Sequence, residues 1–277
     1  MVSRRITVVP RAGLCNRLWV VACAVKYSLA HPEADVEIYW EKHKECNAHF
    51  DELFEPIPMF LPKSVNRLER FRLRVGRKEN LFIPTLIQKC TFDKVLRFRW
   101  WMDRNAFDDV IKNKENIYVE AYETFNSFYV DADLGTYFIP NNIIQRRIDS
   151  IVSQFEGKTV GIHVRRTDNK TAISMNPLSR YIAVMNKEIE KNPEVRFYLA
   201  SDSVEVKEEL SRLFGERIIT TDLFLSRSSL QGMEDAVVDL FSLAHTDYII
   251  GSNHSSYSVV AADLFNKELI LLNDYIL

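Results

Sequence analysis

Apolar runs and amphipathic segments alternate through the second half of the chain. Short apolar runs predict strands at residues 158–164, 195–200, 217–220, 248–250 and 269–272. Between them, helices are predicted at residues 177–191, 204–214, 233–245 and 257–265. The third of these helices carries apolar Val237, Leu240, Phe241 and Ala244 at three- and four-residue spacing. This alternation of strand and helix predicts a doubly wound parallel sheet.

The first half of the chain begins in the same way. A strand at residues 6–9 is followed by a loop ending at Gly13 and by an apolar helix at 15–29, and another strand is predicted at 117–122. A loop between a strand and a helix offers backbone N–H groups and the helix dipole to an anion. The alternative for Gly13 is an ordinary turn, although polar Asn16 and Arg17 favour a loop that faces a cleft.

The middle of the first half, residues 41–116, shows no pattern that assigns its elements and is interpreted only as mixed helix and loop. A chain of 277 residues exceeds one ordinary domain. We therefore expect two α/β domains, residues 1–150 and 151–277, each with its own core.

Composition narrows the class of protein. Hydrophobic residues make up 47% and charged residues 27%, as in globular proteins. The net charge of −2 argues against a general nucleic-acid binder, and the four cysteines show no CxxC spacing that would indicate a zinc site or a disulfide framework. The N-terminus lacks the apolar core of a signal peptide, and no run is long enough to span a bilayer. A cytoplasmic location is expected.

Basic residues concentrate in residues 63–104. Twelve basic and four acidic residues give this segment a net charge of +8, against −10 for the rest of the chain. Aromatic residues are interleaved with them: Phe71, Phe82, Phe92, Phe98, Trp100 and Trp101. Such a composition suits a surface that meets an anionic membrane or an anionic sugar-lipid. The alternatives are a helical excursion packed on its own domain and, without a supporting motif, nucleic-acid binding.

At residues 159–168, Thr-Val-Gly-Ile-His-Val-Arg-Arg-Thr-Asp, an apolar strand-like run leads into a histidine, two arginines and an aspartate. Strand alternation places His163 and Arg165 on one side and Arg166 on the other. A guanidinium fork suits phosphate, so this strand end is a candidate anion site. The alternative is an edge strand with ion-paired arginines.

Other polar residues follow neighbouring strands. Asp202 and Ser255 would reach the same sheet edge as Arg165, where ligands of doubly wound sheets bind. Each also has a structural alternative, because Ser201 and Asp202 can cap the helix at 204–214 and Ser255 and Ser256 the helix at 257–265. Asp239 lies off the apolar stripe of its helix, so it is either a ligand contact or a solvated residue.

Six short segments carry a resemblance to fucosyltransferases. Residues 13–18, Gly-Leu-Cys-Asn-Arg-Leu, resemble the Gly-Leu-Gly-Asn-Gln/Arg-Leu loop of that family, and residues 163–168 resemble the His-Val-Arg-Arg-Thr/Gly-Asp hallmark of its α-1,2 and α-1,6 branches. Weaker similarities lie at residues 119–125, 197–203, 239–244 and 253–258, the last an Asn-Ser-Ser-Phe-Ser-like turn. The chain departs from the pattern at Cys15 and Ala121, where the family has glycine.

The resemblance implies a GT-B fold, with two Rossmann-like domains facing a central cleft. The C-terminal domain would bind GDP-fucose and the N-terminal domain would help to bind a glycan or glycolipid acceptor. Fucose would be transferred with inversion and without a metal or other cofactor. The basic segment, residues 63–104, would allow peripheral contact with the inner face of a membrane.

The resemblance also implies roles for individual residues. Arg165 would neutralise the β-phosphate and stabilise the leaving GDP. The other donor-binding candidates are His163 and Asp239 at the guanine and ribose, Ser255 and Ser256 at the phosphates, Asp202 in the pocket wall, and Gly13 and Asn16 in the N-terminal loop.

A general base must reach the acceptor hydroxyl. The candidates are Asp168, Glu120 and Glu123, in falling order of preference; alternatively, a β-phosphate oxygen takes the proton. Two rival functions stay open. One is a GT-B transferase for another nucleotide sugar, since arginine and serines read the diphosphate and not the base. The other is a non-catalytic nucleotide-sugar-binding protein.

Overall fold

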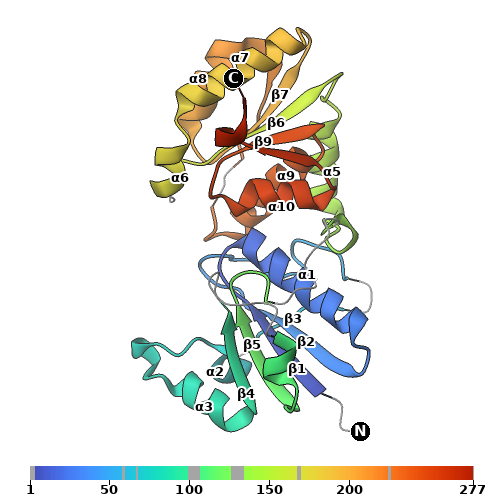
Figure 1. The fold of residues 1–277 in the computed structure, drawn as a ribbon, viewed down its shortest axis with the longest axis vertical. Coiled ribbons are helices and arrows are strands. Elements are labelled where there is room, and N and C mark those ends of the chain that lie inside the picture. The colour runs from blue at the N-terminus through green and yellow to red at the C-terminus, as the bar shows by residue number, and fades with distance from the viewer. Residues whose placement is uncertain are drawn as a thin grey trace. The chain divides into compact units, whose positions relative to one another are not determined.

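The structure is a computed structural model that describes residues 4–57, 60–66, 68–98, 107–125, 134–166, 170–223 and 226–276. Its contacts divide the chain into two compact units (Figure 1). The first unit comprises Met1–Asp131 with Arg227–Leu230, and the second comprises Ala132–Ser226 with Gln231–Leu277. The division falls before the expected boundary at residue 150, because helix α5 (Asn142–Val152) belongs to the second unit.

The first unit is built on a five-stranded parallel sheet in the order β3-β2-β1-β5-β4. Its strands are β1 (Arg4–Pro10), β2 (Ala34–Trp40), β3 (Lys63–Ser64), β4 (Lys94–Phe98) and β5 (Asn116–Ala121). Its helices are α1 (Leu14–Ala30), α2 (Glu69–Leu73), the 3-10 turn η1 (Lys78–Asn80), α3 (Ile83–Thr91) and α4 (Phe107–Ile111). The chain leaves β1 toward β2 on one side, and β5 pairs on the other, so the order of the strands reverses between β1 and β5.

Strands β2, β3 and β4 of this sheet were not predicted, and β3 is only two residues long. In β2 the apolar side chains of Val36, Ile38 and Trp40 alternate with Asp35 and Glu37, a strand pattern that the sequence analysis did not assign. β4 forms within the stretch interpreted as mixed helix and loop. The predicted strand at 6–9, helix at 15–29 and strand at 117–122 are confirmed as β1, α1 and β5.

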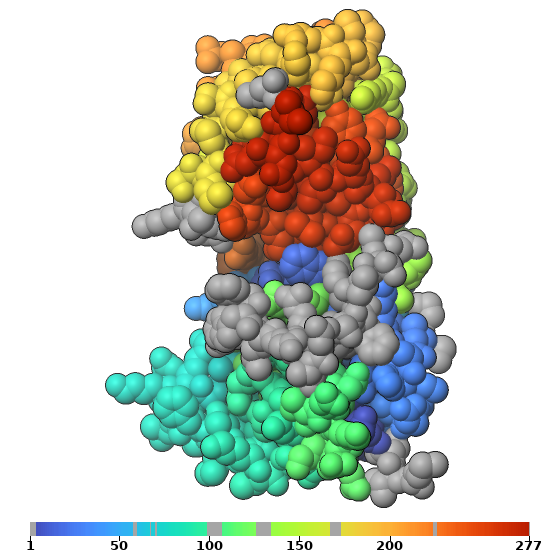
Figure 2. Space-filling model, viewed as in Figure 1, coloured from blue at the N-terminus to red at the C-terminus, as the bar shows by residue number. Residues whose placement is uncertain are grey.

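The basic segment packs on its own unit. Leu73 and Phe92, from either end of the α2–α3 region, join a buried cluster with Val9, Tyr39 and Tyr118 of the sheet. Burial of these large side chains anchors the excursion. Figure 2 shows that the residues around η1 nevertheless stand out at the surface of the unit. Of residues 63–104, residue 67 and residues 99–104, among them Trp100 and Trp101, lie outside the described part of the chain.

The second unit repeats the architecture with the parallel order β10-β9-β6-β7-β8. Its strands are β6 (Thr159–Val164), β7 (Arg196–Ser201), β8 (Ile218–Ile219), β9 (Tyr248–Gly251) and β10 (Glu268–Leu271). Besides α5, its helices are α6 (Lys170–Met175), α7 (Leu178–Lys191), α8 (Val204–Phe214), α9 (Leu230–Ala244) and α10 (Ser256–Leu264). The short 3-10 turns are η2 (Leu134–Thr136), η3 (Gly215–Arg217) and η4 (Leu272–Asp274).

All strands and helices predicted for residues 158–272 are confirmed to within three residues at each end. β6 lies at the centre of the sheet, and all six of its residues are buried, which explains its continuous apolar run. One cap differs from the prediction. The side chain of Ser203, rather than Ser201 or Asp202, accepts a hydrogen bond from Val206 N and caps α8. Within the described residues, no helix is long and apolar enough to cross a bilayer.

Candidate functional site

The order of the strands in the second sheet reverses at β6, so the carboxyl end of β6 is the switch point of this sheet. The chain runs from β6 to β7 and β8 on one side, and β9 and β10 add on the other. In open α/β sheets, ligands bind outside the carboxyl ends of the strands at such a point. His163, Arg165 and Asp202 all lie there, as the sequence predicts.

His163 is buried and neutral. His163 is 4% exposed, and its ring stacks on the ring of Tyr257, with centroids 5.0 Å apart and planes inclined by 25°. Burial, assisted by the positive charge of Arg165, lowers the pKa of His163 to about 3. Its Nδ1 atom has no hydrogen-bond partner among the described residues. A buried ring nitrogen without a partner is costly, so this atom points to a ligand.

Asp239 holds Tyr257 in place. The carboxylate, on α9, is 1% exposed and accepts hydrogen bonds from the hydroxyl groups of Tyr198 at 2.8 Å and Tyr257 at 2.9 Å. Burial raises the pKa of Asp239 above its usual value. The solvated alternative for Asp239 is therefore wrong, and its contact in this structure is with two tyrosines.

Arg165 and Asp202 form an ion pair. Arg165 Nε lies 3.3 Å from Asp202 Oδ2, and the two side chains are 17% and 14% exposed. The other oxygen, Oδ1, accepts a hydrogen bond from the backbone N–H of Arg166 at 2.7 Å. Asp202 thus fixes the backbone after β6 and orients the guanidinium group at the same time.

Ser252 and Tyr181 were not predicted from the sequence, although Ser252 lies in the polar turn that follows β9. Its Oγ atom accepts a hydrogen bond from Arg165 N at 3.0 Å and lies 2.7 Å from the Tyr181 hydroxyl. The Tyr181 hydroxyl also donates to His163 O at 2.9 Å. These two buried side chains lock the backbone of residues 163–165 in place.

The serine turn begins α10. Ser255 is the N-cap, and its hydroxyl accepts a hydrogen bond from Tyr257 N at 3.4 Å. Ser256 is the first residue of the helix, and His254 before it has a φ of 60°. The predicted cap is confirmed, and a helix N-terminus of this kind is compatible with an anion.

In the N-terminal loop, the positive φ falls on Ala12 and not on the glycine or on Cys15. Gly13 has a φ of −76° as the N-cap of α1, whereas Ala12 has a φ of 65°, in the left-handed region that favours glycine. Cys15 lies inside α1, so no turn is needed there. Asn16 donates from Nδ2 to Tyr122 O at 2.7 Å and ties the start of α1 to the end of β5.

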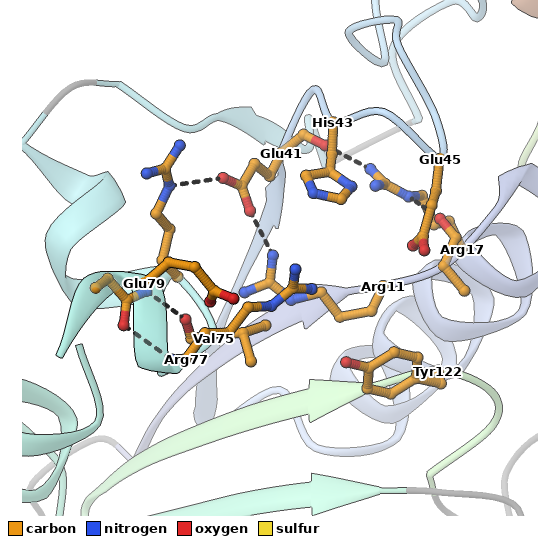
Figure 3. A pocket seen from close by; sticks show the side chains of 12 residues that line it. Arg11, Arg17, Glu41, His43, Glu45, Val75, Arg77, Glu79 and Tyr122 are labelled. Carbon is orange, nitrogen blue, oxygen red and sulfur yellow. Dashed lines mark hydrogen bonds and ion pairs between the residues drawn. The ribbon is translucent and has the colours of Figure 1, made fainter. Parts of the chain in front are cut away.

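A charged pocket of about 370 Å³ opens at the carboxyl ends of β1, β2 and β5 (Figure 3). Its lining residues are Arg11, Ala12, Arg17, Glu41, His43, Glu45, Arg74, Val75, Arg77, Glu79, Asn80 and Tyr122. Because the strand order reverses between β1 and β5, this pocket occupies the switch point of the first sheet. Its floor depends on β2, which the sequence analysis did not assign.

Arg11 and Glu41 point toward one another on this floor, with Arg11 Nη1 2.5 Å from Glu41 Oε2 (Figure 3). Burial alone would lower the pKa of Arg11, but Tyr118, Glu120 and Glu41 raise it above its ordinary value. Arg11 therefore stays charged.

A second arginine lies beside this pair. Arg17 donates from Nη1 to Glu41 O at 2.7 Å, and its guanidinium group lies 5.0 Å from the centroid of the Trp40 ring. Burial lowers the pKa of His43 at the same pocket.

Glu120, a candidate base, lies beneath this floor. It is 1% exposed, accepts a hydrogen bond from the Tyr118 hydroxyl at 3.2 Å and pairs with Arg11 at 3.6 Å and Arg97 at 3.9 Å. Asp168, the preferred base, lies outside the described residues. In the part of the chain that the structure describes, no group of three His, Cys, Asp or Glu side chains is arranged to hold a metal ion.

The sequence matches no protein-family model and no curated protein. Solved structures do match. The chain resembles the α-1,6-fucosyltransferase NodZ soaked with GDP-fucose, with a TM-score of 0.60 at 18% identity over 94% of this chain and 92% of that one. NodZ from Bradyrhizobium is matched again with a TM-score of 0.58 at 18% identity, over 93% and 92% of the two chains. The chain has the fold of fucosyltransferases.

Two further structures agree. A mutant of Arabidopsis thaliana FUT1 in complex with GDP gives a TM-score of 0.63 at 14% identity, covering 96% of this chain and 69% of that one. POFUT1 in complex with GDP-fucose gives a TM-score of 0.54 at 9% identity over 98% of each chain. The α/β fold class of the GT-B type, with two Rossmann-like sheets, is thereby confirmed.

Proposed function

We propose that the protein is an inverting, metal-independent glycosyltransferase that moves fucose from GDP-fucose to a hydroxyl group of a glycan or glycolipid. The observation that carries the proposal is the set of His163, Arg165 and Asp202 at the switch point of the second sheet. The fold supports it, because NodZ soaked with GDP-fucose and POFUT1 in complex with GDP-fucose are similar over nearly the whole chain.

Arg165 acts on the leaving group. Departure of GDP builds negative charge on the β-phosphate oxygens, and a guanidinium group already oriented by Asp202 stabilises that charge without reorganising. Ser255, Ser256 and the N–H groups at the start of α10 would donate to the same diphosphate. Gly13 and Asn16, in the N-terminal loop, are the remaining donor-binding candidates of this proposal.

His163 contacts the nucleoside. Because its pKa is lowered, the ring is neutral at physiological pH and offers a nitrogen acceptor and an N–H donor. Nδ1, buried and without a protein partner, is suited to a ribose or guanine group. Asp239 contributes by holding Tyr257 against the ring.

The proton from the acceptor hydroxyl is assigned first to Asp168, which follows the arginines in the chain. Glu120 is less suited, because it is 1% exposed and paired with Arg11, an arrangement that fits a support for the pocket floor. Glu123 follows it, and direct transfer to a β-phosphate oxygen is the remaining route.

The two halves of the chain divide the work in this proposal. Residues 151–277 bind the donor and residues 1–150 the acceptor, with the charged pocket around Arg11 and Glu41 as the acceptor side. Residues 63–104 make peripheral contact with the inner face of a membrane, which agrees with a cytoplasmic enzyme.

A thermal-shift panel with GDP, UDP, CDP and their sugars tests the donor. We expect GDP and GDP-fucose to raise the melting temperature, while UDP and CDP leave it unchanged. Stabilisation by UDP or CDP only would reject GDP-fucose in favour of another nucleotide sugar. Slow release of fucose from GDP-fucose without acceptor is expected of a transferase, and its absence in a protein that binds GDP-fucose would favour a non-catalytic binding protein.

A further inference from the structure

A second cavity adjoins the charged pocket on the first unit. It measures about 420 Å³ and is lined by Phe71, Arg74, Glu79, Asn80, Leu81, Ile83 and Pro84. Three of these residues, Arg74, Glu79 and Asn80, also line the charged pocket. The two cavities therefore meet along a shared wall, one charged and the other apolar. We call the apolar one the α2–α3 groove.

The groove presents large apolar side chains to solvent. Phe71 is 59% exposed, Leu81 78% and Ile83 45%, and Phe82 and Leu86 beside them are 55% and 65% exposed. Single exposed apolar residues are common, but a contiguous set around a cavity marks a binding surface. Leu73 and Phe92 of this segment join the buried cluster and the exposed set does not, so the exposed set is not part of that core.

The turn that carries Leu81 and Phe82 is strained. Both residues have positive φ, 52° and 55°, which costs a non-glycine residue on the order of 1–2 kcal/mol. The turn is held by hydrogen bonds from Asn80 Nδ2 to Val75 O at 2.8 Å and from Arg77 N to Asn80 Oδ1 at 2.8 Å. Strain of this kind persists only where the surrounding structure enforces it, and it is frequent at ligand-binding sites. Here it turns apolar side chains outward.

Two arginines, Arg74 and Arg77, lie near the wall that the two cavities share. Arg74 is half exposed and lies 3.5 Å from Glu41 through its Nε atom. Arg77, exposed at the mouth of the charged pocket, makes no ion pair with any residue that the structure describes. Over residues 71–84, four basic residues face one acid, a net charge of +3. Guanidinium groups beside an apolar groove match an anionic group that is attached to a hydrocarbon chain.

We propose that the acceptor is a lipid-linked glycan with a phosphate group between lipid and sugar. Its hydrocarbon chain lies in the α2–α3 groove, its phosphate between Arg74 and Arg77, and its sugar in the charged pocket. This proposal rests on the proposed function, since it names the acceptor of the same enzyme. A peptide or a second copy of the chain would account for the apolar groove, but not for a positive rim that opens into a charged cavity.

Amphiphile binding tests the groove without knowledge of the glycan. Dodecyl phosphate, below its critical micelle concentration, is titrated into the full chain by calorimetry, beside dodecyl maltoside and inorganic phosphate. We expect dodecyl phosphate to bind at least about tenfold tighter than either reference, because only it engages both the groove and the arginines. Equal affinity for the two amphiphiles would overturn the phosphate assignment. Equal affinity for dodecyl phosphate and inorganic phosphate would overturn the groove.

Two variants localise the binding. Leu81→Asn keeps a residue that tolerates positive φ while it removes the apolar side chain, and Arg77→Gln removes the charge. Each variant is expected to bind dodecyl phosphate about fivefold more weakly, or weaker still, than the unmodified protein. The matched control is Ile143→Asn, another exposed apolar position, on α5 and 65% exposed, which should bind as the unmodified protein does. Unchanged binding in Leu81→Asn would reject the proposal.

The remaining outcomes separate the inference from the function it rests on. Stabilisation by GDP is measured on the same samples, and Leu81→Asn should retain it. Binding of dodecyl phosphate without any stabilisation by GDP would leave the groove standing and reject the fucosyltransferase. Self-association of the protein that disappears in Leu81→Asn would identify the groove as a contact between copies and would reject the lipid-linked acceptor.

Discussion

The ring of Tyr257 lies on the ring of His163, with centroids 5.0 Å apart, while the Tyr257 hydroxyl donates to buried Asp239 at 2.9 Å. One tyrosine thus connects a carboxylate on α9 to the histidine on β6. Because the His163 ring is neutral and its Nδ1 lacks a protein partner, the stack decides where that nitrogen points. Asp239 therefore acts on the site through Tyr257.

Separate changes at Tyr257 distinguish the stack from the hydrogen bond. Tyr257→Phe keeps the aromatic face, so we expect GDP affinity within about threefold of normal, with stability lower by about 1–3 kcal/mol because a buried carboxylate loses a donor. Tyr257→Ala also removes the aromatic ring that stacks on His163, so the affinity for GDP should fall about tenfold. Calorimetric titration with GDP and denaturant unfolding provide the measurements.

The matched control is Tyr198→Phe. It removes the other hydroxyl donor to Asp239, and the Tyr198 ring is not the one stacked on His163. Its stability should fall like that of Tyr257→Phe, with GDP affinity unchanged. Normal GDP affinity in folded Tyr257→Ala would contradict the role of the stack.

Arg165 is expected to carry the largest single effect on turnover. Arg165→Ala should lower turnover at least about 100-fold, by analogy with the loss of an oxyanion donor. Arg165→Lys keeps the charge but loses the fork and should recover part of the rate. Initial rates of fucose release from GDP-fucose measure both.

Arg166→Ala serves as the comparison, because the Arg166 side chain donates from Nη1 to Ile173 O at 3.4 Å, whereas Arg165 pairs with Asp202. It should retain most of the rate if it folds. A folded Arg165→Ala protein with near-normal turnover would remove Arg165 from the reaction.

The strands and helices of the second unit could be predicted because their burial is simple. β6 is covered on both faces and reads as one apolar run, and the predicted bounds of α8, residues 204–214, agree with the structure. β2 and β4 were harder, because charged residues interrupt their apolar positions. Without β2, the sequence could not indicate that Glu41, just after it, meets Arg11 in a pocket.

The site was predictable where a residue follows a strand directly. Parallel strands bring their carboxyl ends together, so Arg165 and Asp202 could be expected at one sheet edge, and they form an ion pair. Ser252 and Tyr181 act on the backbone of β6 from other elements, and no local pattern announces such contacts. The capping residue of α8 was misplaced by one or two positions for a similar reason, because Ser201, Asp202 and Ser203 are all good caps by type.

In the N-terminal loop, the residue with positive φ is Ala12 and not the neighbouring Gly13. Ala12 holds the left-handed conformation, so Ala12→Gly should stabilise the protein by about 1 kcal/mol through relief of strain. Gly13→Ala should leave stability nearly unchanged, because φ is −76° and an added Cβ would lie 3.8 Å from the nearest atom, Glu45 O. Thermal unfolding of both variants tests this, and strong destabilisation by Gly13→Ala would contradict the loop geometry.

Stability should depend on His163 at mildly acidic pH. The pKa of His163 is about 3 in the folded protein against 6.5 as its ordinary value, so the unfolded chain binds one more proton between those limits. Its contribution is fully present above pH 6.5 and is lost as pH falls toward 3, at up to about 1.4 kcal/mol per pH unit. Asp239, with a raised pKa, acts in the opposite direction, because its folded form holds a proton that the unfolded chain has released.

The two contributions separate by subtraction. His163→Asn removes the histidine proton and leaves Asp239 in place, so the difference in unfolding free energy between the unmodified protein and the variant isolates His163. The unfolding free energy of the unmodified protein should fall relative to that of the variant as pH is lowered from 7 to about 4.5. Above pH 7 the difference between the two should not change with pH. Urea unfolding at a series of pH values measures it. A difference that stays constant over this range would mean that His163 titrates alike in the folded and unfolded states, and would contradict its burial as a neutral ring.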